Sequence, residues 1–223
     1  GIYNSGTLTV SNSTISGNTV GDFGGGIFNN GTLNIANSTL SGNRANFGGG
    51  IFNDSNSTST ISNSTFSANS AVTLGGGLFN QKTNGIVGIV TLTNSTLSGN
   101  SARSNANSVI SSGGIYNDGT LNIANTIIAN STVINSSSPI NDYAGTGNVN
   151  LISSGNINNP TIPANNIVTQ ATSSATNLWA QSVTSAALNL GPLQNNGGPT
   201  ETMALLTGSA AIEAGAIPTL TAA

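Results

Sequence analysis

Residues 24–43 read GGGIFNNGTLNIANSTLSGN, and close copies of this stretch recur along the chain. Residues 48–69 read GGGIFNDSNSTSTISNSTFSAN, and residues 113–130 read GGIYNDGTLNIANTIIAN. The copies begin about 25 residues apart, or slightly more where a loop is inserted. A period of this length indicates a repeat protein in which each copy is one structural unit stacked on the next.

Apolar and polar residues alternate inside each copy. In GTLNIAN, Leu33 and Ile35 are separated by polar residues, which is the pattern of a strand with one buried face. Two further short segments, around Ile27 and Leu40, complete the repeat, so each copy predicts three short strands joined by turns. The expected inward columns are Ile2, Ile27, Ile51, Leu78 and Ile115; Leu8, Leu33, Ser59, Val90 and Leu121; Val10, Ile35, Ile61, Leu92 and Ile123; and Ile15, Leu40, Phe66, Leu97 and Ile128.

A single repeat cannot bury its own apolar face, but stacked copies enclose a continuous core. The predicted fold is therefore all-β, a parallel β-helix (β-solenoid) with three short strands in each coil of about 25 residues. Because parallel crossovers are right-handed in nearly all cases, we expect a right-handed helix. Residues 1–135 are expected to form five coils, residues 136–189 an irregular coil and loops, and residues 190–223 a segment that packs on the solenoid or caps it. Four apolar side chains are expected to cover the C-terminal end of the core: Trp179, Leu188, Leu190 and Leu193.

Asparagine recurs at three fixed places in the repeat. Successive coils of a solenoid lie about 4.8 Å apart, so equivalent side chains stack and asparagine amides can hydrogen-bond from coil to coil. Asparagine also tolerates the left-handed backbone of a tight corner. We therefore expect structural ladders rather than ligand sites in the columns Asn4, Asn29, Asn53, Asn80 and Asn117; Asn12, Asn37, Asn63, Asn94 and Asn125; and Asn18, Asn43, Asn69, Asn100 and Asn130.

The repeats resemble those of bacterial secreted right-handed β-helix proteins, including proteins with polymorphic outer-membrane-protein-like repeats. The segments that carry the resemblance are GGGIFN, GTLTVSNSTISGN and GTLNIANSTLSGN. Residues 190–215, LGPLQNNGGPTETMALLTGSAAIEAG, are similar to the C-terminal region of the choice-of-anchor Q family. The chain departs from that family's usual motif at Met203 (His), Thr207 and Ala210 (both Pro) and Glu213 (Asp). The resemblance implies export and a location at the cell surface or outside the cell, and it implies no agreed enzymatic activity.

The amino-acid composition excludes several classes of function. Of the 223 residues only 4% are charged, and the net charge of −3 leaves no basic patch for nucleic acid or anionic lipid. The chain has neither cysteine nor histidine, which excludes disulfides, thiolate or histidine metal sites and a serine–histidine pair. No stretch is long and apolar enough for membrane insertion, and no cofactor is expected. The chain opens inside a repeat without a signal peptide, so we expect a processed piece of a longer precursor.

The acidic residues are the test for enzymatic activity, because β-helix enzymes that act on polysaccharides need clustered carboxylates, often with calcium. Asp54 and Asp118 occupy equivalent corners two coils apart, which separates them by about 10 Å. Asp22 belongs to another corner, and Glu201 and Glu213 belong to the C-terminal segment. The sequence therefore favours a non-enzymatic protein and ranks a polysaccharide-active enzyme third, after a structural protein and a binding module.

Two outward columns are candidate binding surfaces. A flat T-x-T array of this kind occurs on several ice-binding proteins, although threonine also favours any exposed β position. An extracellular binding module for glycans or ice is therefore the first alternative function. The columns are Thr7, Thr32, Thr58, Ile89 and Thr120, and Thr9, Asn34, Thr60, Thr91 and Asn122.

Two other features are further candidates for recognition. The column Tyr3, Phe28, Phe52, Phe79 and Tyr116 is either an exposed aromatic stripe or is covered by the loops that carry Phe23 and Phe47. The fourth repeat carries inserted loops, residues 81–90 and 101–112, which are candidate recognition loops because function concentrates in insertions. These loops contain Lys82 and Arg103.

The sequence predicts a secreted structural protein that builds extracellular material. A first coil without a cap presents unpaired strands and a slice of core. We expect the C-terminal region of one subunit to dock there on the next, and such heterologous contacts give filaments. Cell-surface glycans are further candidate partners, and neither nucleic acid nor membrane insertion is expected. The residues of the expected assembly interface are Ile2, Tyr3, Leu8 and Val10.

Overall fold

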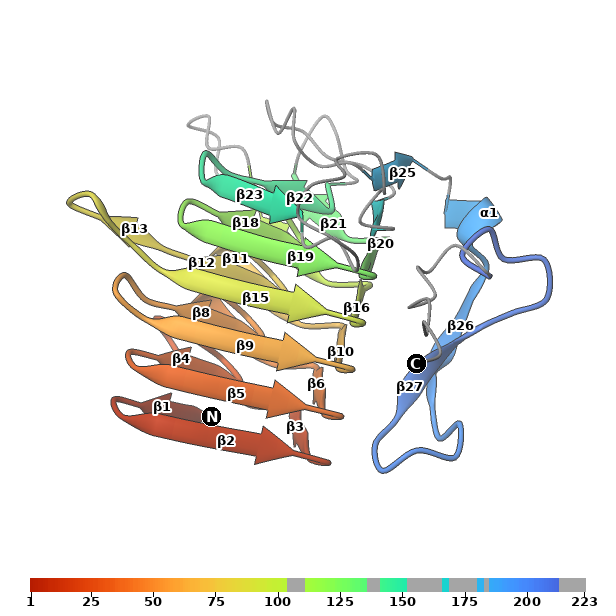
Figure 1. Ribbon diagram of the computed structural model, residues 1–223, viewed down its shortest axis with the longest axis horizontal. Coiled ribbons are helices and arrows are strands. Elements are labelled where there is room, and N and C mark those ends of the chain that lie inside the picture. The colour runs from red at the N-terminus through yellow and green to blue at the C-terminus, as the bar shows by residue number, and fades with distance from the viewer. Residues whose placement is uncertain (104–110, 136–140, 152–165, 169–179, 183–184, 213–223) are drawn as a thin grey trace, which may run out of the picture.

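The computed structural model of the chain describes residues 1–103, 111–135, 141–151, 166–168, 180–182 and 185–212. Strands from successive coils line up in three long parallel sheets, and the coils stack into a solenoid (Figure 1). The first coil, red in Figure 1, lies at one end of the stack, and strands of a sixth coil lie at the other. The predicted all-β, parallel β-solenoid is therefore confirmed.

The first and second sheets each contain one strand from each of six coils. In spatial order the first sheet is β1 (Ile2–Asn4), β4 (Ile27–Asn29), β8 (Ile51–Asn53), β12 (Leu78–Asn80), β18 (Ile115–Asn117) and β22 (Tyr143–Ala144). The second sheet is β2 (Thr7–Ser11), β5 (Thr32–Ala36), β9 (Thr58–Ser62), β15 (Ile89–Thr93), β19 (Thr120–Ala124) and β23 (Asn148–Leu151).

The third sheet completes each coil, and a fourth, shorter sheet is added to it. The third sheet is β3 (Thr14–Ser16), β6 (Thr39–Ser41), β10 (Thr65–Ser67), β16 (Thr96–Ser98), β20 (Ile127–Ala129), β24 (Asn166–Val168) and β25 (Ala180–Ser182). The fourth sheet is β7 (Arg44–Phe47), β11 (Ser70–Leu74), β17 (Ser101–Arg103) and β21 (Thr132–Ile134).

Neighbouring coils pair equivalent residues in register. Ile27 pairs with Ile2 on one side and Ile51 on the other, so alternation along each strand places the same columns inside in every coil. From the second coil to the fifth, the apolar members of these columns are at most 2% exposed, whereas Ile2 in the first coil is 37% exposed. Ser59 is the polar exception, and its hydroxyl donates to Asn53 Oδ1 at 2.7 Å. The predicted inward columns form the core.

Glycine and asparagine make the corners between the strands. The glycine that opens each triple-glycine run has a left-handed backbone, with φ of 65° at Gly24 and 64° at Gly48. Two residues later the coils approach so closely that a Cβ on Gly26 would lie 2.6 Å from the carbonyl oxygen of Gly50. Any side chain at this position would force the coils apart, which explains why glycine recurs here.

The solenoid continues beyond residue 135. Tyr143 pairs with Ile115 and Val149 with Leu121, so β22 and β23 extend the first and second sheets by a further coil. The insertion in the fourth repeat leaves the stack sideways as an antiparallel hairpin of β13 (Lys82–Thr83) and β14 (Ile86–Val87). The inserted residues therefore leave the register of the sheets unchanged.

Residues 185–212, which we call the C-terminal strap, lie along the side of the solenoid (Figure 1). The strap contains α1 (Ser185–Leu188) and an antiparallel hairpin of β26 (Leu190–Gln194) and β27 (Thr202–Leu205). Leu188 is fully buried against Ala129, on the outer face of the third sheet, and Leu190 packs beside it. These two residues therefore cover the side of the solenoid rather than its end, and Leu193 lies opposite Met203 within the hairpin. The expected role of Trp179 lies outside the described residues.

Leu92→Ala tests the continuous core. Leu92 is fully buried between the equivalent residues of two neighbouring coils. We expect the substitution to lower the free energy of unfolding by about 2–5 kcal/mol, because it removes buried methyl groups and leaves a cavity. Urea denaturation measures the loss. The neighbouring outward substitution Thr91→Ala is the control and should cost less than about 1 kcal/mol; equal losses would contradict the assignment of faces.

Candidate functional site

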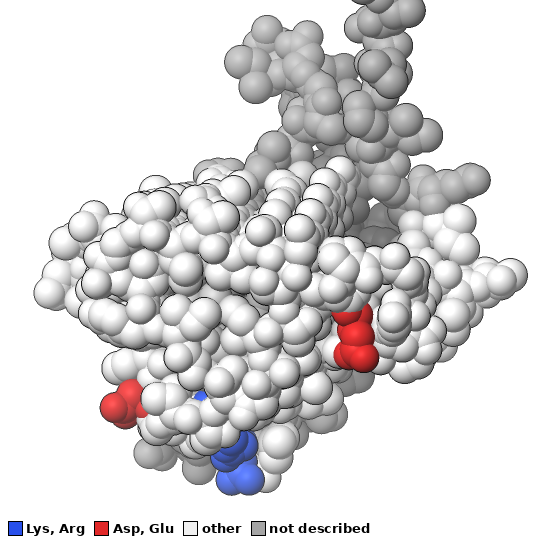
Figure 2. Space-filling model, turned by 90° about the horizontal axis from the view of Figure 1, so that it is seen from below, with Lys and Arg blue, Asp and Glu red and all other residues white. Residues whose placement is uncertain are grey.

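Charged side chains are few and scattered over the described residues. Figure 2, which looks onto the first coil, shows a largely uncharged surface with isolated charged groups. The carboxylate of Asp54 accepts a hydrogen bond from the Ser55 N–H at 2.8 Å, and that of Asp118 accepts hydrogen bonds from the N–H and hydroxyl of Thr146 at 3.0 and 2.9 Å. Asp54 thus bonds within its own corner, and Asp118 bonds to the corner of the next coil. In the described part of the chain, no three histidine, cysteine, aspartate or glutamate residues gather where they could hold a metal ion.

The first asparagine column is a continuous ladder of buried amides. Each Nδ2 donates to the Oδ1 of the next asparagine at 2.7–2.9 Å, from Asn4 through Asn29, Asn53 and Asn80 to Asn117. At the far end, Asn117 donates to the hydroxyl of Tyr143 at 3.2 Å. All the amide dipoles therefore point in the same direction along the solenoid axis.

The third column forms a second ladder with the same polarity. The Nδ2 groups of Asn18, Asn43 and Asn69 each donate to the Oδ1 of the next asparagine at 3.0 Å, and the column continues as far as Asn100. The backbone N–H of each donor residue also points to that oxygen, at 3.0 Å. Each rung is thus bound twice, which fixes the spacing of the coils at this corner.

The assignment of Asn130 to this ladder is wrong. Ala129 pairs with Ser98, so Asn130 takes the corner position of Gly99, and Ser131 takes the ladder position of Asn100. The φ of 57° at Asn130 is left-handed, like the 67° at Gly99. The spacing of five residues in this repeat, against six in the others, was the sequence signal for the shift.

The second column is a set of corners rather than a buried ladder. Its five asparagines have φ between 48° and 50°, which few residues other than glycine and asparagine adopt without strain. Among the described residues, one amide-to-amide hydrogen bond joins this column, from Asn125 to Asn94 at 3.2 Å. The left-handed backbone therefore explains why asparagine recurs at this corner, and a continuous ladder of amide hydrogen bonds does not.

A column of serine follows these corners and was not expected from the sequence. The backbone N–H groups of Ser13, Ser38 and Ser64 each donate to the hydroxyl of the next serine in the column at 3.2 Å, as far as Ser95. The repeated triplet NST was the signal for this column, since its serine recurs as regularly as its asparagine. The serines thus add a third line of axial hydrogen bonds.

The aromatic column forms one row of a two-row apolar stack. Tyr3 and Phe28 stack at 5.3 Å between ring centroids, and Phe28 and Phe52 do so at the same distance. The second row lies over the first: Phe23 lies 4.6 Å from Phe52, and Phe47 lies 6.0 Å from Phe79. The loops therefore cover the middle of the column, where Phe52 is 2% exposed, and leave Tyr3 67% exposed.

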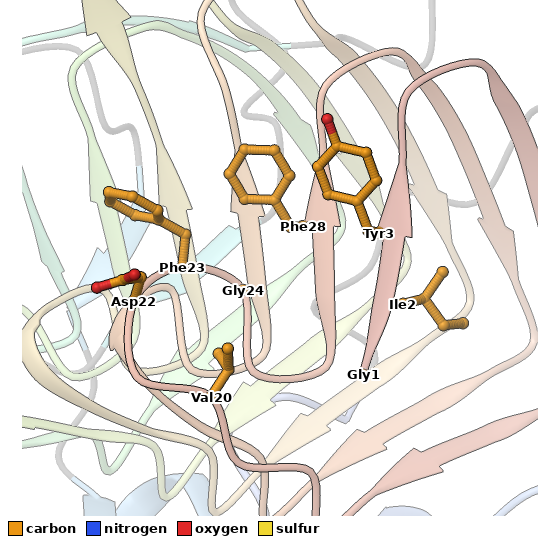
Figure 3. Close-up of a pocket in the computed structure, with 8 residues that line it drawn as sticks. All are labelled: Gly1, Ile2, Tyr3, Val20, Asp22, Phe23, Gly24 and Phe28. Atoms are coloured by element: carbon orange, nitrogen blue, oxygen red, sulfur yellow. The ribbon is translucent and has the colours of Figure 1, made fainter.

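A pocket of about 370 Å³ lies where the second row ends, beside the first coil (Figure 3). Tyr3 and Phe28 form one wall, Phe23 and Val20 face them, and Asp22 lies at the edge. The pocket occupies the place of one further apolar side chain below Phe23 in the second row.

The expected assembly residues lie on two different surfaces of the first coil. Ile2, Leu8 and Val10 belong to the inward columns, and Val10 is only 8% exposed. Tyr3 points outward and lines the pocket. An added coil would therefore meet Ile2 and Leu8 at the core and Tyr3 at the aromatic rows.

The outward side chains of the five strands β2, β5, β9, β15 and β19 form a surface that we call the hydroxyl face. Thr7, Thr9, Thr58 and Thr60 are exposed on it, and the equivalent residues of neighbouring strands are in register. Ile89, which is 38% exposed, interrupts one column between Thr58 and Thr120. No Lys, Arg, Asp or Glu occurs in these five strands.

The two basic residues of the candidate loops lie on different elements. Lys82 is exposed in the β13–β14 hairpin, and Arg103 is exposed at the end of β17. Residues 104–110 lie outside the described part of the chain, and the recognition role of both loops stays a prediction.

No family model, no curated protein and no solved structure matches the chain. The β-solenoid rests on the strand pairing, and the two family resemblances stay predictions. None of the helices in the described segments is long and apolar enough to cross a membrane.

Asn53→Asp tests the first ladder, because it keeps the shape of the side chain but turns a carboxylate oxygen towards Asn80 Oδ1. Burial raises the pKa of the new carboxyl. The part of the destabilisation that comes from its charge is therefore absent below about pH 4 and grows as the pH rises towards the folded-state pKa. We expect a loss of about 3 kcal/mol or more at pH 7 and a clearly smaller loss at pH 4, measured by urea denaturation. The exposed substitution Asn56→Asp is the control. Equal losses at the two pH values would refute the buried ladder.

Tyr143→Phe tests the end of the same ladder. Without the hydroxyl, Asn117 keeps the carbonyl of Asn148 as an acceptor at 3.2 Å, so we expect a loss of about 1 kcal/mol at pH 7. Desolvation by burial raises the pKa of Tyr143 above 10.0, the Asn117 hydrogen bond opposes this, and Asp118 adds to it. Wild-type stability therefore falls as the pH rises above 10, and the variant should fall less steeply. Tyr116, whose pKa is also raised by burial, should leave part of this pH dependence in the variant. Tyr3→Phe, which removes an exposed hydroxyl, is the control and should leave the stability at pH 7 unchanged.

Proposed function

We propose that this chain is a structural protein of the cell surface or extracellular space, whose solenoids stack end to end into filaments. The observation that carries the proposal is the in-register repeat of the coils, because each coil is built to pair with an equivalent coil on either side. A further coil below β1, β2 and β3 can come from chain that precedes residue 1 or from another subunit, and the filament uses the second source. The resemblance to secreted β-helix proteins supports the proposed location.

The polarity of the ladders supports head-to-tail stacking. Because aligned amide dipoles add, the first ladder has its carbonyl end at Asn4 and its donor end towards Tyr143. A subunit added below the first coil in the same orientation would turn the donor side of its ladder, which ends at the Tyr143 hydroxyl, towards Asn4 Oδ1. A subunit related by a two-fold axis would bring carbonyl oxygen to carbonyl oxygen.

The surface of the first coil also suits such a contact. Ile2 is 37% exposed there, whereas Ile27 in the next coil is fully buried, so an added coil would complete the burial. The pocket beside Tyr3 and Phe28 would receive the next apolar side chain of the second row. Only isolated charges surround this end, so repulsion between subunits is weak (Figure 2).

Ile2→Asp tests the filament. A charge buried in the joint without a partner should raise the concentration needed for assembly about tenfold or more. Light scattering and electron microscopy across a concentration series measure the effect, and circular dichroism confirms that the solenoid remains folded. Thr9→Asp, which adds the same charge to the outer face of the first coil, should assemble like the wild type. A wild-type chain that stays monomeric at high concentration would refute the proposal.

A further inference from the structure

The outer faces of the three long sheets differ in what covers them. The aromatic rows cover much of the first sheet, and the C-terminal strap covers the third. Within the described residues, the hydroxyl face of the second sheet keeps exposed threonines in several coils, such as Thr7, Thr32 and Thr60. This face does not depend on the ends of the solenoid, so it is independent of filament assembly.

The third sheet shows how a hydroxyl-rich face of this solenoid holds an extended chain. In β3, β6, β10 and β16 its outward residues are also threonine and serine, and Thr39 and Thr65 are at most 5% exposed. The Thr39 hydroxyl donates to the carbonyl of Glu201 at 2.6 Å, and the Thr200 hydroxyl donates to the carbonyl of Asn37 at 3.4 Å. The strap runs along the solenoid axis, across the strands (Figure 1). An outward threonine of this solenoid can therefore bind the backbone of a chain that runs along the axis, and the in-register threonines of the hydroxyl face repeat that group from coil to coil.

We infer that the hydroxyl face binds a neutral, extended polysaccharide of the cellulose or chitin type, laid along the axis with one sugar on each coil. The coils are about 4.8 Å apart, close to the advance of one pyranose ring in such a straight chain. Threonine hydroxyls and asparagine amides both donate and accept hydrogen bonds, as sugar hydroxyls do.

Charge decides between neutral and acidic glycans. The five strands of the hydroxyl face carry no Lys or Arg that could pair with a uronate carboxylate. An acidic chain would therefore lose the hydration of its carboxylates without a compensating ion pair. The face from β2 to β19 is roughly 20 Å long, so it holds about five sugars. Binding should strengthen with chain length up to that size and then level off.

Ile89 is the weak point of the face and gives the sharpest test. Its side chain lies between Thr58 and Thr120 in the column and offers no hydrogen bond to a sugar. Ile89→Thr keeps a β-branched side chain and completes the column, so it should strengthen binding about fivefold. Thr60→Val keeps the shape but removes a hydroxyl, so it should weaken binding by a similar factor.

The experiment measures depletion of the full chain from solution by insoluble cellulose and chitin, and titrates soluble oligomers of two to eight sugars. Thr132→Val, which removes an exposed hydroxyl from the fourth sheet, is the control and should bind like the wild type. Alginate and pectate should not bind. Ile2→Asp should retain binding, which separates this surface from the filament joint.

Three results would overturn the inference. The first is no binding of the wild type to any neutral glycan, and the second is equal binding by Thr60→Val, Ile89→Thr and the wild type. The third is thermal hysteresis of freezing that Thr60→Val abolishes while no glycan binds, which would assign the face to ice.

Discussion

The hydrogen bond from one buried asparagine amide to the next is the interaction on which the rest of the structure depends. A buried amide without a partner costs about 1–3 kcal/mol, so each asparagine requires an equivalent one in register on the neighbouring coil. From Asn4 to Asn117 this requirement fixes which residues lie above one another. The same register then aligns the apolar columns inside and the threonine columns outside.

Much of the fold was predictable from the sequence because one pattern is repeated several times. The alternation around Leu33 and Ile35 predicts one strand in one repeat. Because the same alternation recurs in every repeat, it also predicts a stack of equivalent strands with a continuous core. The ladder of Asn53 and its neighbours followed from the same columns. Whether loops cover Phe52 was left open, because the spacing of the repeats does not say over which face of the solenoid a loop runs.

The features that were missed depend on contacts between distant residues or on a change in repeat spacing. Matching equivalent residues between repeats does not reveal either. The fourth sheet joins segments of irregular composition such as Arg44–Phe47, which carry no alternation. Asn130 was misplaced because the identity of the residue was followed instead of the one-residue change in spacing. The strap's position required knowing that Leu188 meets Ala129, a contact between residues far apart in the sequence.

The strap has a consequence for how the molecule unfolds. In a simple solenoid each coil contacts only its neighbours, so unfolding can begin at an end and spread one coil at a time. Here the strap binds the second coil through Thr39 and the fifth through Ala129, and thereby links coils that do not touch. The coils between these two points should open as one cooperative unit, while the first coil exchanges its amide hydrogens earlier.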